Sequence, residues 1–309
     1  FPYPFWITKN TNDHDRIKLL IAVLSQNPPL LLSLTAIIGL LGGSFLNVVI
    51  LRLPRRLFFE WRGECRALLE DEGASVSGLP EQSEPPGIVF PRSRCGSCDT
   101  PIRAIDNIPI LSFLLLRGRC RACGAAIGWR YPLVEALTAI ASVVVVWHFG
   151  WGWMALAGVL FTWALIALAG IDLDYQILPD PMTLGLLWAG LLIALAGWSP
   201  LDPAGAIIGA AAGYLALWLV YHGFRLVTGK EGMGHGDFKL LGAAGAWLGW
   251  QMLPLVILSA SLLGAVIGSA WLALQRQGRQ TPIPFGPFLA LSSWIALIWG
   301  EPIMRAYLG

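Results

Sequence analysis

The chain has 309 residues, of which 56 % are hydrophobic and only 13 % are charged, and its mean hydropathy is +0.64. A water-soluble domain carries roughly 25 % charged residues, so this composition excludes an ordinary soluble globular protein. The formal net charge is only +2. We do not read this small basic excess as a sign of nucleic-acid binding, because the positions of Lys and Arg follow a membrane topology.

Residues 1–28 form a leader segment, and its first 27 residues carry charges throughout, so we expect no cleavable signal peptide there. A helix needs about 20 apolar residues to cross a bilayer. The apolar runs that approach or reach this length are 29–51, 132–149, 152–171, 181–198, 204–227, 238–250, 253–274 and 286–300. The sequence therefore predicts an all-α polytopic membrane protein with about eight transmembrane helices, two of them short.

A polar insert, 52–131, separates the first predicted helix (29–51) from a block of about seven helices, 132–309. Within the insert, 71–89 is acidic and rich in Pro, Gly and Ser, which predicts a flexible loop. The apolar stretch 108–116 (IPILSFLLL) is too short to span a bilayer. It is either the buried core of the insert or a segment lying at the membrane interface.

Basic residues favour the cytoplasmic side of a membrane. The insert holds 12 of the 21 Lys and Arg residues. Alternating the predicted spans places 172–180, 225–239 and 275–284 on the same side as the insert. That side then carries 17 basic residues and the opposite side 4. We therefore expect the insert to face the cytoplasm.

Glycines recur every four residues at Gly205, Gly209 and Gly213, and again at Gly264 and Gly268. In lipid, this spacing lets two helix backbones approach closely. We predict that these glycines serve helix packing.

Four of the five cysteines form two pairs, Cys95–x2–Cys98 and Cys120–x2–Cys123. The flanking residues repeat as well, in RCGSCDTPI and RCRACGAAI. Two such knuckles supply the four thiolates of a tetrahedral zinc site. Disulfide pairing is the alternative, which a reducing cytoplasm disfavours. Four cysteine ligands leave no open position, so we expect a structural zinc. Cys65 has no evident role.

Carboxylates near a bilayer are energetically costly and mark candidate sites. One group is Asp172, Asp174 and Asp180 in IDLDYQILPD, and the other is Asp237 in MGHGDFKLL. Asp180 precedes a proline, which is typical of a helix cap. Asp172 continues the apolar run directly and should lie deeper than Asp174, which we expect to be solvated. Asp172 is thus the better partner for Asp237.

Two aspartates on different helices at one depth suggest an aspartyl protease. Close like charges cannot both ionise, so one carboxyl keeps its proton for the peptide carbonyl while the other activates water. Gly236 would leave room for a substrate backbone beside Asp237. An ion-coupled transporter that uses intramembrane aspartates is the alternative, and a pair of helix caps is the plainest explanation. His235 is more typical of a loop residue than of a metal ligand.

The motifs together resemble the bacterial type IV prepilin peptidases, which are GxGD-type intramembrane aspartyl proteases and N-methyltransferases of pilus and type II secretion systems. The resemblance runs from about residue 33 to the end. It is carried by GSFLNVVILRLP (43–54), the two CxxC knuckles, RYPLVE (130–135), IDLDYQILPD (171–180), VTGKEGMGHGDFKLLGAAGAW (227–247) and TPIPFGPFLA (281–290).

The resemblance implies that Asp172 and Asp237 are the catalytic pair. It implies prepilins and pseudopilins as substrates, each cut after a Gly at the cytoplasmic face of the bacterial inner membrane. It also implies methylation of the new N-terminal amine with S-adenosylmethionine, and it favours zinc at the four cysteines. Lys239 is expected on another face of its helix than Asp237, with its stem reaching the lipid headgroups.

The site of the methyl donor is not evident, since the sequence has no glycine-rich dinucleotide-type loop. We place it in the area of the insert and the cytoplasmic helix ends. Glu135 is either a helix-dipole partner in the first turn of its span, which we slightly favour, or a site residue. The particular pilins that are cut and the oligomeric state are not readable from the sequence.

Overall fold

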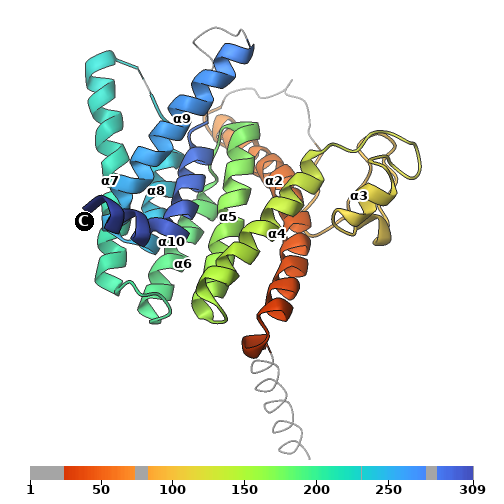
Figure 1. Cartoon of the computed structure of the whole chain (residues 1–309). Helices are drawn as coiled ribbons and strands as arrows, with labels where there is room; N and C mark the ends of the chain where they lie inside the picture. The colour runs from red at the N-terminus through yellow and green to blue at the C-terminus, as the bar shows by residue number, and fades with distance from the viewer. Residues whose placement is uncertain (1–23, 74–82, 231, 276–283, 309) are drawn as a thin grey trace, which may run out of the picture.

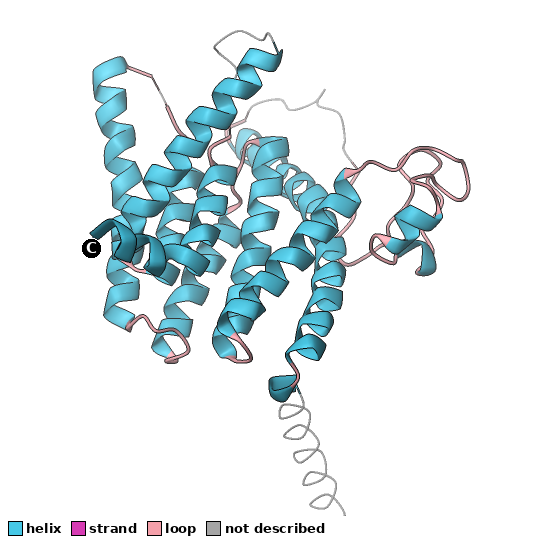
Figure 2. Ribbon diagram, in the orientation of Figure 1, coloured by secondary structure: helices cyan, strands magenta, loops and turns pink. Residues whose placement is uncertain are grey.

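The computed structural model describes residues 24–73, 83–230, 232–275 and 284–308, and in these ranges it is helical with connecting loops and two isolated β-bridges (Figures 1 and 2). The prediction of an all-α protein is confirmed. Most of the predicted leader and part of the predicted 71–89 loop lie outside the described residues. The helices are α2 (Pro28–Asp71), α3 (Leu111–Leu115), α4 (Arg130–Phe149), α5 (Trp153–Tyr175), α6 (Asp180–Leu195), α7 (Pro203–Thr228), α8 (His235–Leu248), α9 (Leu253–Gln275) and α10 (Gly286–Leu308).

Six helices in the described ranges are long and apolar enough to cross a membrane: α2, α4, α5, α7, α9 and α10. The other two predicted spans correspond to α6, with 16 residues, and α8, with 14. At 1.5 Å per residue these two helices are roughly 24 and 21 Å long, which is less than the ~30 Å hydrocarbon core. The chain is a multi-pass membrane protein in which two short helices accompany six full spans.

Helix α8 is a core helix of the bundle. From Asp237 to Trp247 every residue except Lys239 is buried, with Phe238, Leu240 and Leu241 fully inaccessible. A helix that is apolar on every side has to be surrounded by other protein or by lipid. Here α6, α7 and α10 pack against it. Helix α8 therefore has fixed neighbours around the end that carries Asp237.

The predicted glycine packing is confirmed at Gly209 and Gly213, which face α8. A Cβ atom on Gly209 would lie 2.2 Å from the carbonyl oxygen of Gly245, and one on Gly213 would lie 2.4 Å from that of Leu241. The two backbones are thus in direct contact. Gly205 has a different role, because its N–H donates to the side chain of Asp202 (3.2 Å) at the start of α7.

Helix α2 has 44 residues and is roughly 66 Å long, so it continues well past the predicted span 29–51. Its first half packs on α4, where a Cβ on Gly43 would lie 2.6 Å from Glu135 Cα. Its second half belongs to the predicted insert and reaches the end of α5, where the rings of Phe58 and Tyr175 are 6.0 Å apart.

Consecutive helices run in alternate directions (Figure 1). The insert between α2 and α4 is therefore at the same end of the bundle as the end of α5 and the starts of α6, α8 and α10. This end, which we call the insert end, carries both candidate aspartates.

The stretch 108–116 is not the buried core of the insert, so that expectation was wrong. Only Leu111–Leu115 is helical, and the side chains of Leu111, Leu114 and Leu115 are 50 %, 62 % and 73 % exposed. The insert has too few apolar residues around α3 to enclose it. The alternative, a segment at the membrane interface, is considered below.

Candidate active site and metal centre

Asp172 lies in the last turn of α5 and is buried, with 6 % of its surface exposed. The backbone N–H of Gly286, at the start of α10, donates to its Oδ2 (3.0 Å). A Cβ on Gly286 would lie only 2.6 Å from that oxygen, so a glycine is required for this approach. The start of α10 thus fixes the position of the Asp172 carboxylate.

Asp237 is the third residue of α8 and is equally buried, with 6 % exposed. Its N–H donates to the carbonyl oxygen of Gly234 (3.2 Å), which closes the first turn of the helix. A Cβ on Gly234 would lie 3.6 Å from Asp237 Oδ2, which is an ordinary van der Waals distance.

Asp172 and Asp237 lie close enough for their negative charges to repel each other. Leu178, in the loop between α5 and α6, lies beside both segments. A Cβ on Gly236 would lie 2.8 Å from Leu178 Cβ, and one on Gly286 would lie 3.2 Å from Leu178 Cδ2. The expectation that Gly236 leaves free space for a substrate backbone is therefore wrong, because Leu178 fills that space and packs against Gly236 and Gly286.

The other two aspartates have cationic partners. Asp174 is paired with Arg130 of α4, which also donates to the carbonyl of Gly170 (3.3 Å). The side chain of Asp174 is 28 % exposed, while Asp172 is buried, as the depth argument predicted. Among the described residues, no ion pair includes Asp172 or Asp237.

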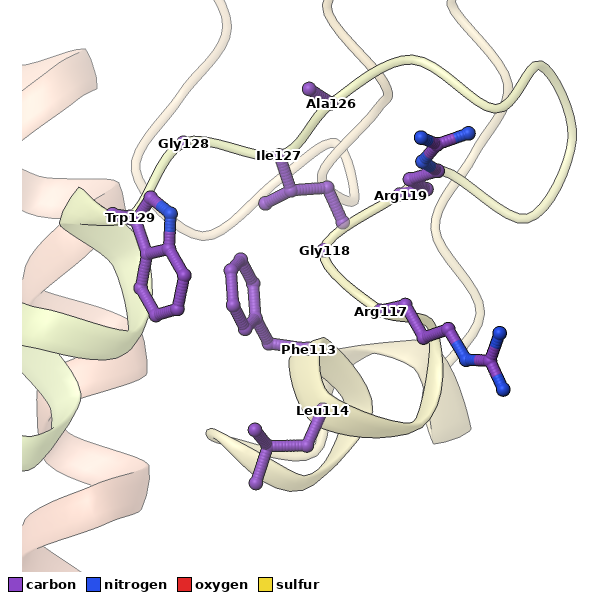
Figure 3. Close-up of a pocket in the computed structure, with 9 residues that line it drawn as sticks. All are labelled: Phe113, Leu114, Arg117, Gly118, Arg119, Ala126, Ile127, Gly128 and Trp129. Carbon is purple, nitrogen blue, oxygen red and sulfur yellow. The ribbon is translucent and has the colours of Figure 1, made fainter.

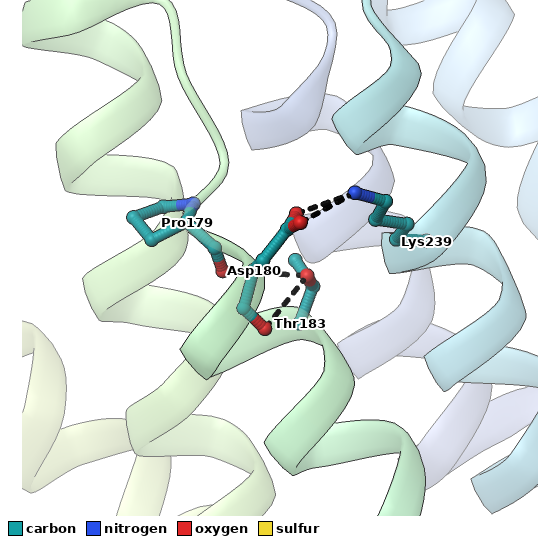
Figure 4. A network of polar contacts seen from close by, with 4 residues as sticks. All are labelled: Pro179, Asp180, Thr183 and Lys239. Atoms are coloured by element: carbon teal, nitrogen blue, oxygen red, sulfur yellow. Dashed lines mark hydrogen bonds and ion pairs between the residues drawn. The ribbon is translucent and has the colours of Figure 1, made fainter. Parts of the chain in front are cut away.

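Asp180 does not cap α6, contrary to expectation. The helix begins at Asp180 itself, the N-cap position is Pro179, and no side chain caps it. The carboxylate of Asp180 instead accepts two hydrogen bonds from Lys239 Nζ, at 2.6 and 2.7 Å (Figure 4). Lys239 therefore joins α8 to α6, so the expectation that it reaches the headgroups is wrong. The attraction between Lys239 and the nearby carboxylate of Asp180 is stronger than what Lys239 would gain by extending to the headgroups.

His235 is also not a loop residue, because it is the first residue of α8. Its ring contacts Tyr221 of α7 (5.1 Å between centroids) and Phe238 (5.4 Å). His235 is exposed, and its ring lies against these two aromatic side chains at the start of α8.

The four cysteines of the knuckles come together, as the spacing predicted. Their Sγ atoms all lie within 4.8 Å of one another, and those of Cys95 and Cys123 are 3.8 Å apart. Sulfurs at about 2.3 Å from a tetrahedral zinc would be roughly 3.8 Å apart, so the four side chains fit a zinc ion. The cluster can hold a metal ion.

The two knuckles have the same backbone geometry. In each, the N–H of the first cysteine donates to the carbonyl oxygen of the residue five positions later. Cys95 donates to Thr100 (3.0 Å) and Cys120 donates to Ala125 (2.8 Å). The residue after the second cysteine has a positive φ in both, 54° at Asp99 and 71° at Gly124. The repeat seen in the sequence is thus a repeated turn.

Backbone donors favour the thiolate form of the first cysteine in each knuckle. The N–H groups of Ser97 and then Cys98 lower the pKa of the Cys95 thiol, and those of Cys123 and then Ala122 lower the pKa of Cys120. Since metals bind thiolates, this arrangement suits a metal site. Cys65 is exposed on α2 and lies outside the cluster.

Glu135 connects the insert to the bundle. It is in the second turn of α4 and is buried, and its Oε2 accepts a hydrogen bond from the backbone N–H of Ile110 (2.8 Å). The expected role as a helix-dipole partner in the first turn is therefore wrong, because α4 begins five residues earlier, at Arg130.

A hollow of about 600 Å³ lies between α3 and the second knuckle (Figure 3). Its wall includes Phe113 and Trp129, whose ring centroids are 4.9 Å apart, and Arg117 and Arg119. The hollow is at the edge of the insert, and no contact joins it to the two aspartates in the described part of the chain.

Sequence reasoning missed Gly286 and Leu178 as parts of the aspartate site. Gly286 belongs to TPIPFGPFLA, a stretch singled out only through the resemblance, and its N–H contact with Asp172 crosses 114 residues of chain. No local pattern predicts a contact of that range.

Comparisons with known proteins identify the family. Residues 37–149 match the bacterial peptidase A24 N-terminal domain, and residues 159–269 match the type IV leader peptidase family. Three similar proteins, each named prepilin leader peptidase/N-methyltransferase, come from Aeromonas salmonicida (strain A449), Pseudomonas aeruginosa and Legionella pneumophila. They are 53 %, 49 % and 43 % identical over 94 %, 94 % and 93 % of this chain, and the matches cover 98 %, 97 % and 98 % of those proteins. No solved structure matches the chain.

The chain belongs to the type IV leader peptidase family. It is an enzyme, a peptidase with an N-methyltransferase activity, and the resemblance noted in its motifs is confirmed.

Proposed function

We propose that this enzyme removes the leader peptides of type IV prepilins and of type II secretion pseudopilins, and then methylates the new N-terminal amine. The shared name of its relatives supports the prepilin as substrate. The observation that carries the proposal is the burial of two interacting carboxylates, Asp172 and Asp237, on different helices at one end of the bundle.

In the proposed reaction, Asp172 and Asp237 share one proton. The ionised carboxylate takes a proton from water, and the water oxygen attacks the carbonyl carbon of the leader's terminal Gly. The protonated carboxyl donates to the carbonyl oxygen. When the tetrahedral intermediate collapses, the C–N bond breaks and the new amine receives a proton, so the products are the leader's carboxylic acid and the mature pilin's amine.

The site's place in the fold suits such a substrate. Asp172 is in the last turn of its span and Asp237 in the first turn of α8, so both lie near the membrane surface. An apolar pilin helix can remain in lipid while its scissile bond emerges at that depth. The basic bias of the loops supports a cytoplasmic insert end, with the protein in the inner membrane of a bacterium.

We propose a structural zinc ion bound by Cys95, Cys98, Cys120 and Cys123. It would hold the part of the insert (52–131) that carries the knuckles, while the block 132–309 carries the peptidase pair.

S-adenosylmethionine supplies the methyl group in the second reaction. We place its site at the insert end, where the new amine is formed.

The direct test incubates the purified full chain with a membrane-anchored prepilin, with and without S-adenosylmethionine, and measures product masses. We expect cleavage in both samples and an added methyl group only with the methyl donor. Ion flux in liposomes that depends on Asp172, with no cleavage of the prepilin, would instead support the transporter.

A further inference from the structure

Helix α3 and the residues just before it present an apolar surface that no part of the described chain covers. Its members are Ile105, Ile108, Leu111, Leu114 and Leu115, which are 42 % to 73 % exposed. We call this set the α3 apolar surface. Five large aliphatic side chains together are more than the scattered single apolar residues of an ordinary protein surface.

The neighbouring helix shows what this surface faces. Helix α4 is a membrane span, and Trp129, just before it, is followed by Leu133, Leu137 and Ile140 along one face of the helix. These four side chains are 76 %, 67 %, 50 % and 63 % exposed, so this face has to lie against lipid. We call it the α4 lipid face.

A ring contact joins α3 to the start of the α4 lipid face. Phe113 of α3 packs on Trp129, with ring centroids 4.9 Å apart (Figure 3). Trp129 therefore joins the upper end of the α4 lipid face to α3, and Trp is the residue typical of the membrane–water boundary.

A hydrogen bond sets the depth of α3 along α4. The N–H of Ile110, just before α3, donates to Oε2 of Glu135 (2.8 Å). Glu135 is the sixth residue of α4, about 8 Å along the helix from Arg130. The start of α3 is thus level with the second turn of a spanning helix.

The charges around α3 suit a lipid surface as well. Asp106, beside Ile105, accepts hydrogen bonds from Arg121 (2.7 to 3.1 Å) and is only 11 % exposed, so its charge is compensated. Arg117, which follows α3, is exposed and extends from it, whereas Arg119 lies on the side of α3 opposite to Leu114 (Figure 3). A basic residue at the edge of an apolar face can pair with lipid phosphates.

We propose that the α3 apolar surface lies in the headgroup–acyl boundary of the bilayer at the insert end, with Arg117 at the level of the phosphates. Interfacial segments of this kind bury an apolar face about 5–10 Å into that boundary. The insert is then attached to the membrane at two places, through α2 and α4 and through α3. This attachment holds the four-cysteine cluster at a fixed height above the lipid, independently of the chemistry at Asp172 and Asp237.

The test uses the full chain in nanodiscs of phosphatidylethanolamine and phosphatidylglycerol. A photoreactive benzoylphenylalanine is introduced in place of Leu114 or Leu115, and in a control in place of the exposed Ala122 in the second knuckle. We expect at least fivefold more lipid adduct, measured by mass spectrometry, at Leu114 and Leu115 than at Ala122. Leader cleavage by each variant shows that the chain is folded.

Equal adduct at the three positions would overturn the proposal. Cross-links from Leu114 and Leu115 to a second copy of the chain would also overturn it. Cross-links that form only with added prepilin, and that join the prepilin, would overturn it as well. As a second measurement, the unlabelled protein in nanodiscs is exposed to hydroxyl radicals, and the α3 leucines should be protected from oxidation. Oxidation of Leu114 and Leu115 at the rate of fully solvated leucines would also overturn the proposal.

Discussion

The backbone N–H of Gly286 donates a hydrogen bond to Oδ2 of Asp172 across 3.0 Å, and it joins the start of α10 to the last turn of α5. Because Gly286 lacks a Cβ, the backbone reaches the buried carboxylate directly. The carboxylate is thereby held in one position relative to Asp237.

The first prediction is that Gly286→Ala lowers leader cleavage by on the order of 10- to 100-fold while the protein still inserts. The new methyl group would lie 2.6 Å from Asp172 Oδ2 and displace the carboxylate. A misplacement of about 1 Å can reduce the rate of a catalysed reaction to this extent. The measurement is kcat on a purified prepilin. Gly223→Ala in α7 is the matched control, since nothing lies within 4 Å of the added Cβ, and it should cleave normally. Equal rates for both variants would remove Gly286 from the site.

The second prediction concerns the ion pair between Lys239 and Asp180. Asp180→Asn should retain measurable cleavage, because this carboxylate is 56 % exposed and already occupied by Lys239. The free energy of unfolding should fall by about 1 kcal/mol or less, as expected for a pair open to solvent. Asp180→Lys alone should lose stability and cleavage, and combining it with Lys239→Asp should restore both. Thermal unfolding and turnover measure both effects, and an inactive Asp180→Asn with normal folding would place Asp180 in the reaction.

The third prediction concerns the metal. Purified protein should hold one zinc per chain, and Cys95→Ser with Cys98→Ser should lose it. Four-thiolate zinc sites contribute on the order of 10 kcal/mol to folding in small domains. Proteolysis should therefore become faster within 92–131, while the block 132–309 stays intact. Cleavage of prepilin should survive in part, and methylation should fall further. A metal content near zero with Cys95 oxidised to Cys98 in fresh membranes would show a disulfide instead.

The fourth prediction concerns the connection between Glu135 and Ile110. Glu135→Leu leaves the Ile110 N–H without its acceptor, which costs about 1–3 kcal/mol when the group is buried. Glu135→Gln keeps an acceptor oxygen and should behave nearly as the native protein. Hydrogen exchange at Ile110 separates the two variants. Equal exchange rates would show that Glu135 does not hold the insert.

Much of the fold could be predicted from local patterns. Apolar runs indicate where helices are, and the glycine spacing on α7 predicts the close contact with α8 at Gly209 and Gly213. The repeated CxxC turns are local too, so the cluster of four sulfurs followed from the sequence. Helix ends were less predictable: Asp180 and His235 each begin a helix rather than precede it.

The long-range contacts could not be predicted in the same way. The partners of Lys239, Glu135 and Asp172 come from other segments of the chain, 59, 25 and 114 residues away. A single sequence shows that a charge near the membrane needs a partner, but several partners satisfy that need. Packing of the whole bundle decides among them. The exposure of α3 also depends on tertiary structure, because the same apolar letters fit a core or a membrane interface.

The central claim is that Asp172 and Asp237 together cleave the leader. The most direct measurement compares cleavage of a membrane-anchored prepilin by purified Asp172→Asn, Asp237→Asn and Asp174→Asn, with correct insertion verified for each. We predict no detectable cleavage by the first two variants and clear cleavage by Asp174→Asn, whose carboxylate is paired with Arg130. Near-normal cleavage by Asp172→Asn or Asp237→Asn, or an inactive Asp174→Asn beside an active Asp172→Asn, would contradict the account.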